Sequence, residues 1–271
     1  MSSAKAFADE NAAFDKLKNY LNRKADVFQA PAGADAGFPD YGFTVYLDDN
    51  STVDLHIEYK NSHTAQMGSM RDWHFDGRQF STPDSNSEQK DELISLMNNT
   101  PVAIRNGKRL LKDLKTFFSA DVKSIYSGSL TVIKDKLQRY NSLMQFVENT
   151  RDYQIANIAD SQLGNKIITH YKNKFKKSRV TGRASGHILL MQIKDEMWYL
   201  DTYGTVTPAI LEEVSKKIGA NKTIQRMTGL TAQLEVRIQP RGTTSKGAKP
   251  VSIDVMASYR LKGKPAGGAS L

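Results

Sequence analysis

Two acidic side chains and a lysine in the first quarter of the chain have the types and spacing to do chemistry together. The segment Thr52 to Lys60 is rich in strand-forming residues, and period-two alternation along a strand puts Glu58 and Lys60 on one face. The preceding segment is also β-rich and begins directly after Asp40, while Asp48 to Ser51 between the two has the composition of a turn. We therefore expect a hairpin that brings Asp40 alongside Glu58 and Lys60.

Metal-assisted phosphodiester hydrolysis is the chemistry that suits these three groups. Carboxylate oxygens are hard ligands that hold Mg²⁺ or Mn²⁺ and leave coordination positions for water and for a phosphate oxygen. A bound metal lowers the pKa of its water and stabilises the departing oxygen. A neighbouring lysine can orient or help to deprotonate the attacking water and can offset charge on the phosphorus.

These residues resemble the signature of the PD-(D/E)xK nuclease superfamily, which has restriction-endonuclease-like members. The pattern here is Pro39-Asp40, seventeen residues, then Glu58-Tyr59-Lys60, within a match that covers about residues 1 to 65. The resemblance implies a mixed-sheet core flanked by helices and a DNA endonuclease that depends on Mg²⁺, with Mn²⁺ as a substitute. Asp40, Glu58 and Lys60 would be its catalytic residues. An exonuclease or a junction-resolving nuclease would use the same motif.

A further acid precedes the motif. Residues Ser3 to Arg23 predict an amphipathic helix, and Glu10 falls on its apolar face between Phe7 and Phe14. A carboxylate on that face is costly to bury without a partner. The resemblance implies that such a helix supplies a metal ligand beside Asp40 and Glu58; a buried lysine or arginine partner, or an edge position open to water, would also explain Glu10.

Other polar residues lie near the motif. Asp54 and His56 share the strand face of Glu58, where they would either extend the site or, as we favour, form an exposed polar strand face. His63 and Gln66, just beyond Lys60, are candidates for contact with the scissile phosphate.

The excess of positive charge lies in the C-terminal part of the chain. The whole chain carries a formal net charge of +9, and residues 165–271 hold 19 Lys and Arg against 7 Asp and Glu. Basic side chains that neutralise phosphates release condensed counterions, so DNA is the expected partner; a solvated helix face is the alternative. The predicted DNA-binding residues are Lys166, Lys172, Lys174, Lys176, Lys177, Arg179, Arg183, Arg241, Lys246 and Lys249.

Periodicity along the chain predicts a mixed α/β fold with a helical middle and a basic, β-rich C-terminal part. After the hairpin, helices are expected at 87–97, 107–118, 131–149 and 160–177. Strands follow at 187–193 and 197–201, then a helix at 208–218 and strands at 232–239 and 251–261. We expect a nuclease core in residues 1–100 and a DNA-binding part in 101–262, which would form one continuous domain with the core or a second one. Residues 263–271 would be a disordered tail.

Several classes of protein are excluded by what the sequence lacks. It contains no cysteine, no apolar run long enough for a membrane span, no visible secretory signal and no phosphate-binding Gly-Lys-Ser/Thr loop. The missing cysteines fit a reducing cytoplasm, and together with the small size and the lone nuclease core they would suit a phage or mobile-element enzyme in a bacterial or phage-infected cell. The rival interpretation is a non-catalytic DNA-binding or nucleoprotein-structural protein whose acids are ordinary strand-end charges. No segment indicates an interface, although a homodimer would be common for such nucleases.

Overall fold

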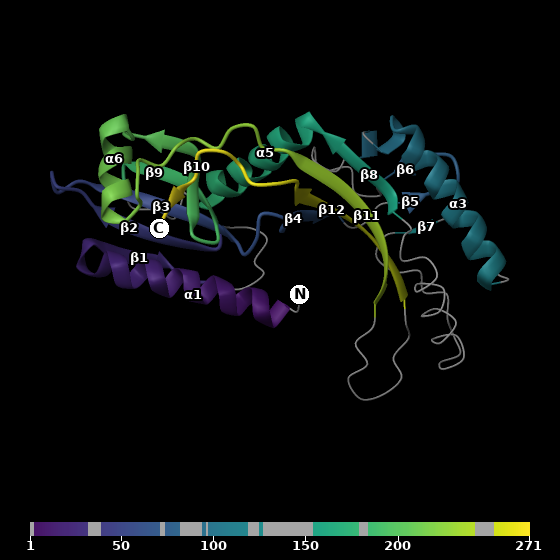
Figure 1. The fold of residues 1–271 in the computed structure, drawn as a ribbon, viewed down its shortest axis with the longest axis horizontal. Helices are drawn as coiled ribbons and strands as arrows, with labels where there is room; N and C mark the ends of the chain where they lie inside the picture. Colours follow the sequence, from purple (N-terminus) through teal and green to yellow (C-terminus); the bar gives the residue numbers. More distant parts are fainter. Residues whose placement is uncertain are drawn as a thin grey trace. The chain divides into compact units, whose positions relative to one another are not determined.

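The computed structural model describes residues 3–31, 39–70, 74–81, 94–95, 97–118, 125–126, 154–178, 184–241 and 252–271. They fall into two compact units, each assembled from separated segments of the chain (Figure 1). Unit 1 comprises residues 1–65, 161–231 and 261–271, and unit 2 comprises residues 66–160 and 232–260. The boundary expected near residue 100 therefore falls inside unit 2.

Unit 1 contains a six-stranded mixed sheet. Its strands are, in spatial order, β1 (Ala25–Gln29), β2 (Tyr41–Tyr46), β3 (Thr52–Lys60), β9 (Gly186–Ile193), β10 (Glu196–Gly204) and β13 (Ala269–Ser270). β3 and β9 are parallel, whereas the other neighbours pair antiparallel. The expected hairpin is the β2–β3 pair, and the chain is a mixed α/β protein as predicted.

Helices cover both faces of this sheet. On one face, α1 (Ser3–Leu21), which continues into the short 3₁₀ helix η1 (Asn22–Lys24), and α6 (Pro208–Lys217) share a core with the inward side chains of the strands. Phe14 and Val214 belong to that core together with Leu55. On the opposite face, α5 (Ser161–Ser178) packs Phe175 against His56 of β3. Alternation along β3 thus sends its apolar residues toward α1 and its polar residues toward α5.

Unit 2 holds two smaller sheets and a helix. One sheet has the order β4 (Gln66–Met70), β12 (Ser252–Leu261), β11 (Ala232–Arg241) and β8 (Gln154–Asp160). The other has the order β6 (Phe80–Ser81), β5 (His74–Phe75) and β7 (Ile125–Tyr126). Helix α3 (Pro101–Phe118) contacts β8.

The predicted elements agree closely with the structure in unit 1, and one prediction about the C-terminus is wrong. The tail expected to be disordered instead ends in β13, which pairs with Glu196 and Met197 of β10. Gly268 lies against the ring of Trp198, where a larger side chain would clash, and the Leu271 N–H donates to the Asp195 carbonyl. The small residues that suggested disorder serve close packing.

The helix expected at 131–149 and most of that at 87–97 lie outside the described residues. Within the described ranges, no helix combines the length and the apolar character needed to cross a membrane.

Candidate active site

The β2–β3 hairpin brings Asp40 to the end of β3, as the spacing of the motif predicts. Tyr41 pairs with Ile57, so the residue before β2 lies beside the last residues of β3. The Asp40 Oδ2 accepts a hydrogen bond of 2.7 Å from the Tyr59 N–H. On the other side, the Gln29 side chain donates to the carbonyl of Pro39. The first contact holds the Asp40 carboxyl group at the end of the β2–β3 pair, and the second holds the backbone just before it.

Glu58 is buried between two ammonium groups. Lys60 Nζ lies 2.6 Å from its Oε1, and Lys174 Nζ of α5 lies 2.8 Å from its Oε2. Glu58 is only 3% exposed. Lys174 was predicted from its basic neighbours to bind DNA; the structure pairs its ammonium group with the buried Glu58 carboxylate. The sequence gives no signal for this placement, because it depends on how α5 crosses β3.

The charges of this group are mutually stabilised. Burial by itself would raise the pKa of Glu58, but the attraction of Lys60 and Lys174 outweighs it and lowers that pKa. Burial would likewise lower the pKa of Lys60, yet the nearby Glu58 carboxylate holds it well above its ordinary value. Lys60 is therefore a permanent cation at neutral pH. Of the roles considered for it, orienting water and offsetting phosphate charge fit this state better than accepting a proton.

Asp40 and Glu10 have the opposite character. Burial, reinforced by the charge of Glu58, raises the pKa of Asp40 to about 6. Burial and the charge of Asp40 raise the pKa of Glu10 to about 7. The Glu10 Oε1 is buried with no hydrogen-bond partner among the described residues. The lysine or arginine partner that would have explained this acid is not found within the same ranges; Lys60 attracts it only at longer range.

These observations test whether a cation suits the acidic cluster, defined here as Glu10, Asp40, Glu58 and Lys60. A partnerless buried carboxylate oxygen costs free energy, and a divalent cation would supply its missing partner. The oxygen donors are those that Mg²⁺ and Mn²⁺ prefer. The three carboxylates interact electrostatically but are more widely spread than the ligands of a closed site. Among groups of three or more His, Asp or Glu residues in the described part of the chain, only Asp54, His56 and His187 have ligand atoms that all lie within 4.8 Å of one another.

The prediction that Asp54 and His56 form an exposed polar face is wrong. Asp54 is 0% and His56 is 1% exposed, because α5 covers this face of β3. Asp54 accepts from the Thr44 hydroxyl (2.6 Å) and from the Ala184 N–H (3.1 Å). Burial and the neighbouring His187 lower the pKa of His56 to about 3. The parallel β3–β9 pairing sets His187 beside Asp54, 133 residues away in the sequence, so no local pattern points to His187 as a neighbour of this strand.

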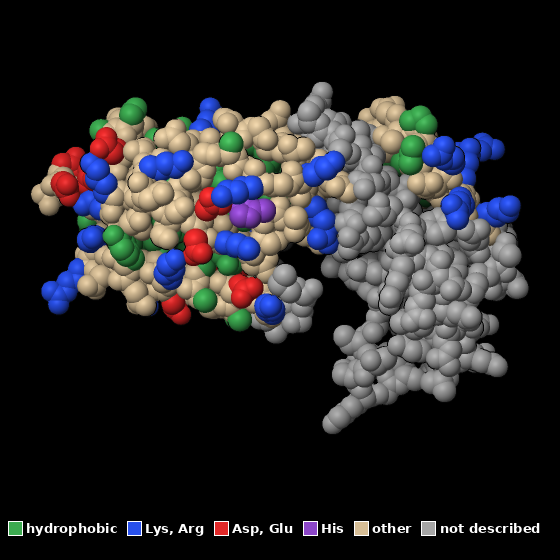
Figure 2. Space-filling model, in the orientation of Figure 1, with side chains coloured by type: hydrophobic (Ala, Val, Ile, Leu, Met, Phe, Trp, Pro, Cys, Tyr) green, Lys and Arg blue, Asp and Glu red, His purple; other side chains and the backbone are tan. Residues whose placement is uncertain are grey.

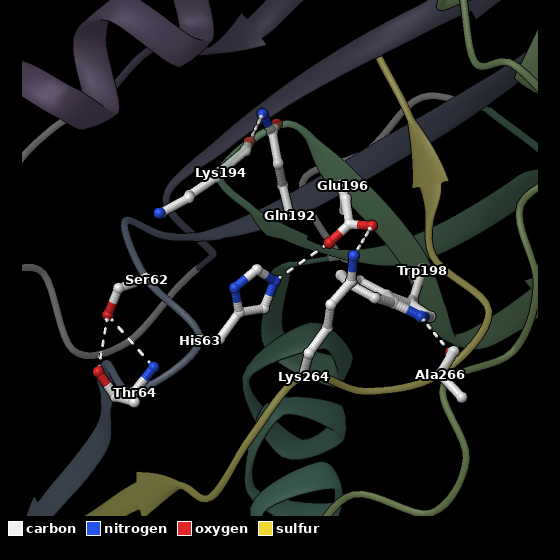
Figure 3. A network of polar contacts seen from close by, with 9 residues as sticks. All are labelled: Ser62, His63, Thr64, Gln192, Lys194, Glu196, Trp198, Lys264 and Ala266. Atoms are coloured by element: carbon white, nitrogen blue, oxygen red, sulfur yellow. Dashed lines mark hydrogen bonds and ion pairs between the residues drawn. The ribbon is translucent and has the colours of Figure 1, made fainter.

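The two candidates for phosphate contact beyond Lys60 have other surroundings. The His63 ring lies 3.1 Å from Glu196, whose second oxygen pairs with Lys264 at 2.6 Å (Figure 3). This network ties the loop after β3 to β10 and to the C-terminal segment. Gln66 begins β4, which belongs to unit 2. Contact of either residue with a phosphate stays a prediction.

The predicted DNA-binding residues are described only in part. Lys166, Lys172, Lys174 and Lys176 lie on α5, where Lys172 pairs with Asp201 at 3.4 Å. Arg179, Arg183, Lys246 and Lys249 lie outside the described residues, and so do the side chains of Lys177 and Arg241. On the visible face of unit 1, basic side chains are interspersed with acidic ones (Figure 2).

Helix α3 carries a basic stripe that the sequence-based prediction of DNA-binding residues does not include. Four exposed basic residues follow the i, i+3, i+4, i+7 spacing that places side chains on one helix face. Lys and Arg side chains gather over this helix in Figure 2. Counting charge over long segments hides the stripe, because acidic residues elsewhere in the N-terminal part cancel it. The stripe consists of Arg105, Lys108, Arg109 and Lys112.

No protein-family model matches the chain, and no curated protein is significantly similar to it.

Proposed function

We propose that the protein is a divalent-metal-dependent DNA endonuclease of the PD-(D/E)xK type. The observation that carries the proposal is the convergence of the motif residues with Glu10, whose Oε1 is buried without a partner beside Asp40 and Glu58. A structural ion-pair cluster would pair its buried carboxylates with cations. Here two lysines compensate Glu58, and two further acids with raised pKa values remain.

Each residue has a definite role in this proposal. Glu10, Asp40 and Glu58 hold Mg²⁺ or Mn²⁺, with Asp40 oriented by the Tyr59 N–H. The bound metal supplies an activated water and charge stabilisation at the leaving oxygen. Lys60, held charged and in place by Glu58, orients the attacking water and offsets negative charge on the scissile phosphate. Lys174 adds a second positive charge that attracts the phosphodiester into the site.

The proposal that the partner is DNA rests on the distribution of charge. The C-terminal excess of Lys and Arg and the stripe on α3 both suit a polyanion, and the affinity of such contacts falls steeply with salt. A cytoplasmic location belongs to the same proposal, since a chain without cysteine suits a reducing compartment.

The test is cleavage of covalently closed plasmid with Mg²⁺, with Mn²⁺ and with EDTA. A closed circle has no ends, so cutting identifies an endonuclease rather than an exonuclease. We expect metal-dependent nicking that is lost in the double variant Glu58→Ala, Lys60→Ala. The matched control is Glu212→Ala, Lys216→Ala, which removes an exposed ion pair of the same residue types from α6 and should cut normally. Band retardation without cutting, unchanged in the first variant, would point to the non-catalytic DNA-binding protein instead.

A further inference from the structure

A second polar cluster lies on the same face of β3, nearer the start of the strand. Asp54 and His56 of β3 meet His187 of β9, and all three are buried, with His187 the most exposed at 7%. The His56 Nε2 and the His187 Nδ1 are 3.3 Å apart, and the Asp54 Oδ2 lies 3.5 Å from the same His187 nitrogen. Two imidazole nitrogens and one carboxylate oxygen thus lie close together within unit 1.

The two separations at His187 Nδ1 match those between ligand atoms around a small divalent ion, and all three ligand atoms lie within 4.8 Å of one another. Zn²⁺ takes nitrogen ligands at roughly 2.0–2.1 Å and carboxylate oxygens at roughly 2.0–2.2 Å in tetrahedral geometry, which places neighbouring ligand atoms about 3.3–3.5 Å apart. Direct hydrogen bonds fit the arrangement less well. The His187 Nδ1 either accepts from the His56 Nε2–H or donates its single proton to one neighbour, so direct hydrogen bonding cannot satisfy both His56 and Asp54.

Outer contacts already orient the carboxylate. The Thr44 hydroxyl donates to Asp54 Oδ1, and the Ala184 N–H donates to Asp54 Oδ2. Such secondary hydrogen bonds fix ligand geometry in metal sites and raise metal affinity. The position of Asp54 is therefore set before any ion binds.

An apolar shell surrounds the imidazole of His56. The rings of Phe28 and Phe175 lie 5.1 and 5.2 Å from it, centroid to centroid. Gly42 permits this, since a Cβ at that position would meet the Phe28 ring at 2.3 Å. On the other side, the Tyr203 ring lies 6.4 Å from the His187 ring and is 56% exposed, so an ion would reach the cluster from the His187 side.

We propose that Asp54, His56 and His187 form a binding site for a borderline transition-metal ion of the Zn²⁺ class, separate from the hard-oxygen acidic cluster. Imidazole nitrogen suits Zn²⁺, Co²⁺ or Ni²⁺, whereas Mg²⁺ prefers oxygen ligands. The ion would tie β3 to β9 and so stabilise the strand pair that presents Glu58. The proposal stands whether or not the protein cuts DNA.

Titration of the metal-free full chain with Co²⁺ tests this site, because tetrahedral Co²⁺ has visible d–d absorption. We expect one tight Co²⁺ per chain, retained in excess Mg²⁺ and displaced by Zn²⁺. His187→Gln and Asp54→Asn should each weaken binding by more than about 100-fold, beyond the 10- to 100-fold that loss of an outer partner costs. His63→Gln is the matched control, and the acidic variant Glu58→Ala, Lys60→Ala should bind Co²⁺ as the wild type does.

Three outcomes would overturn the proposal: no tetrahedral Co²⁺ spectrum, a spectrum unchanged in His187→Gln, or a spectrum lost in the acidic variant. If His187→Gln fails to fold, His187→Cys tests the same position, because a thiolate ligand adds an intense charge-transfer band to bound Co²⁺. Absence of that band from the Cys variant would also count against the site. None of these measurements depends on cleavage activity. Failure of the metal-site proposal can therefore be distinguished from failure of the nuclease proposal.

Discussion

Strand β3 presents two polar pairs on one face, and their surroundings differ. At Asp54 and His56, β2 contributes the Thr44 hydroxyl, the segment before β9 contributes the Ala184 N–H, and β9 contributes the imidazole of His187. At Glu58 and Lys60, α5 contributes an ammonium group and α1 contributes a carboxylate whose Oε1 has no partner among the described residues. The same alternation pattern therefore yields a nitrogen-rich cluster at one end and an acid–lysine cluster at the other, because different elements cross each end.

The largest effect should come from Lys60. Lys60→Met keeps much of the side-chain volume but removes the charge that we assign to the transition state, and we expect plasmid cutting to slow by about 1,000-fold or more, or about 4 kcal/mol of activation free energy. DNA affinity in EDTA should stay within about threefold. Single-turnover cleavage and fluorescence anisotropy measure the two quantities. A Lys60→Met protein that cuts at the wild-type rate would remove Lys60 from the chemistry.

Two nearby lysines on α5 allow an effect on the acidic cluster to be distinguished from an effect of surface charge. Lys174 pairs with buried Glu58, whereas Lys172 pairs with half-exposed Asp201. We expect Lys174→Met to slow cleavage by about 10- to 100-fold and Lys172→Met to change it by less than about threefold. Because Lys174 helps to lower the pKa of Glu58, its loss should also move the acidic limb of the pH–rate profile to higher pH. Equal effects of the two variants would indicate ordinary DNA contacts.

The pH dependence of stability should reveal the acids of the cluster. The pKa of Glu10 is raised to about 7 and that of Asp40 to about 6, so the folded chain binds protons more tightly than the unfolded chain does. Stability of the metal-free protein should therefore fall as the pH rises from about 5 to about 8. Glu10→Gln should remove about half of this slope and stabilise the metal-free protein at pH 8 by about 1 kcal/mol, after allowance for screening at a half-exposed group.

Chemical denaturation at several pH values measures that slope, with and without Mg²⁺. Mg²⁺ should stabilise the wild type and leave Glu10→Gln nearly unchanged. Asp15→Asn, on the same helix, is the control for general charge effects. Destabilisation of the metal-free protein by Glu10→Gln would mean that Glu10 serves the fold rather than a cation.

The smallest effect concerns the basic stripe on α3. Arg105→Ala with Lys108→Ala should lower DNA affinity by about 3- to 10-fold and reduce the slope of log affinity against log salt by about 2, if each side chain neutralises one phosphate. The control is Lys216→Ala with Lys222→Ala on unit 1. An unchanged salt slope in the α3 variant would exclude this stripe from the DNA contact.

Local patterns explain which features were predictable. The hairpin, the shared face of Glu58 and Lys60, and the inward position of Glu10 all follow from turn composition and from the periods of strand and helix. The positions of Lys174 and His187 in these clusters were not predictable. The first segment of unit 2 and helix α5 lie between β3 and β9 in the sequence, so the parallel pairing of these two strands is long-range. The burial of Asp54 and His56 was missed for the same reason, since no local pattern shows that a distant helix covers that face.

The central claim is that the acidic cluster is a metal-dependent catalytic site, and cleavage of closed plasmid by wild type and Glu58→Gln in parallel tests it most directly. The glutamine variant keeps the shape of the side chain and removes its charge. We expect the wild type to nick the plasmid in Mg²⁺ and not in EDTA, and the variant to nick it in neither. Cutting by the variant at the wild-type rate, or no cutting by a folded wild type that binds DNA, would contradict it.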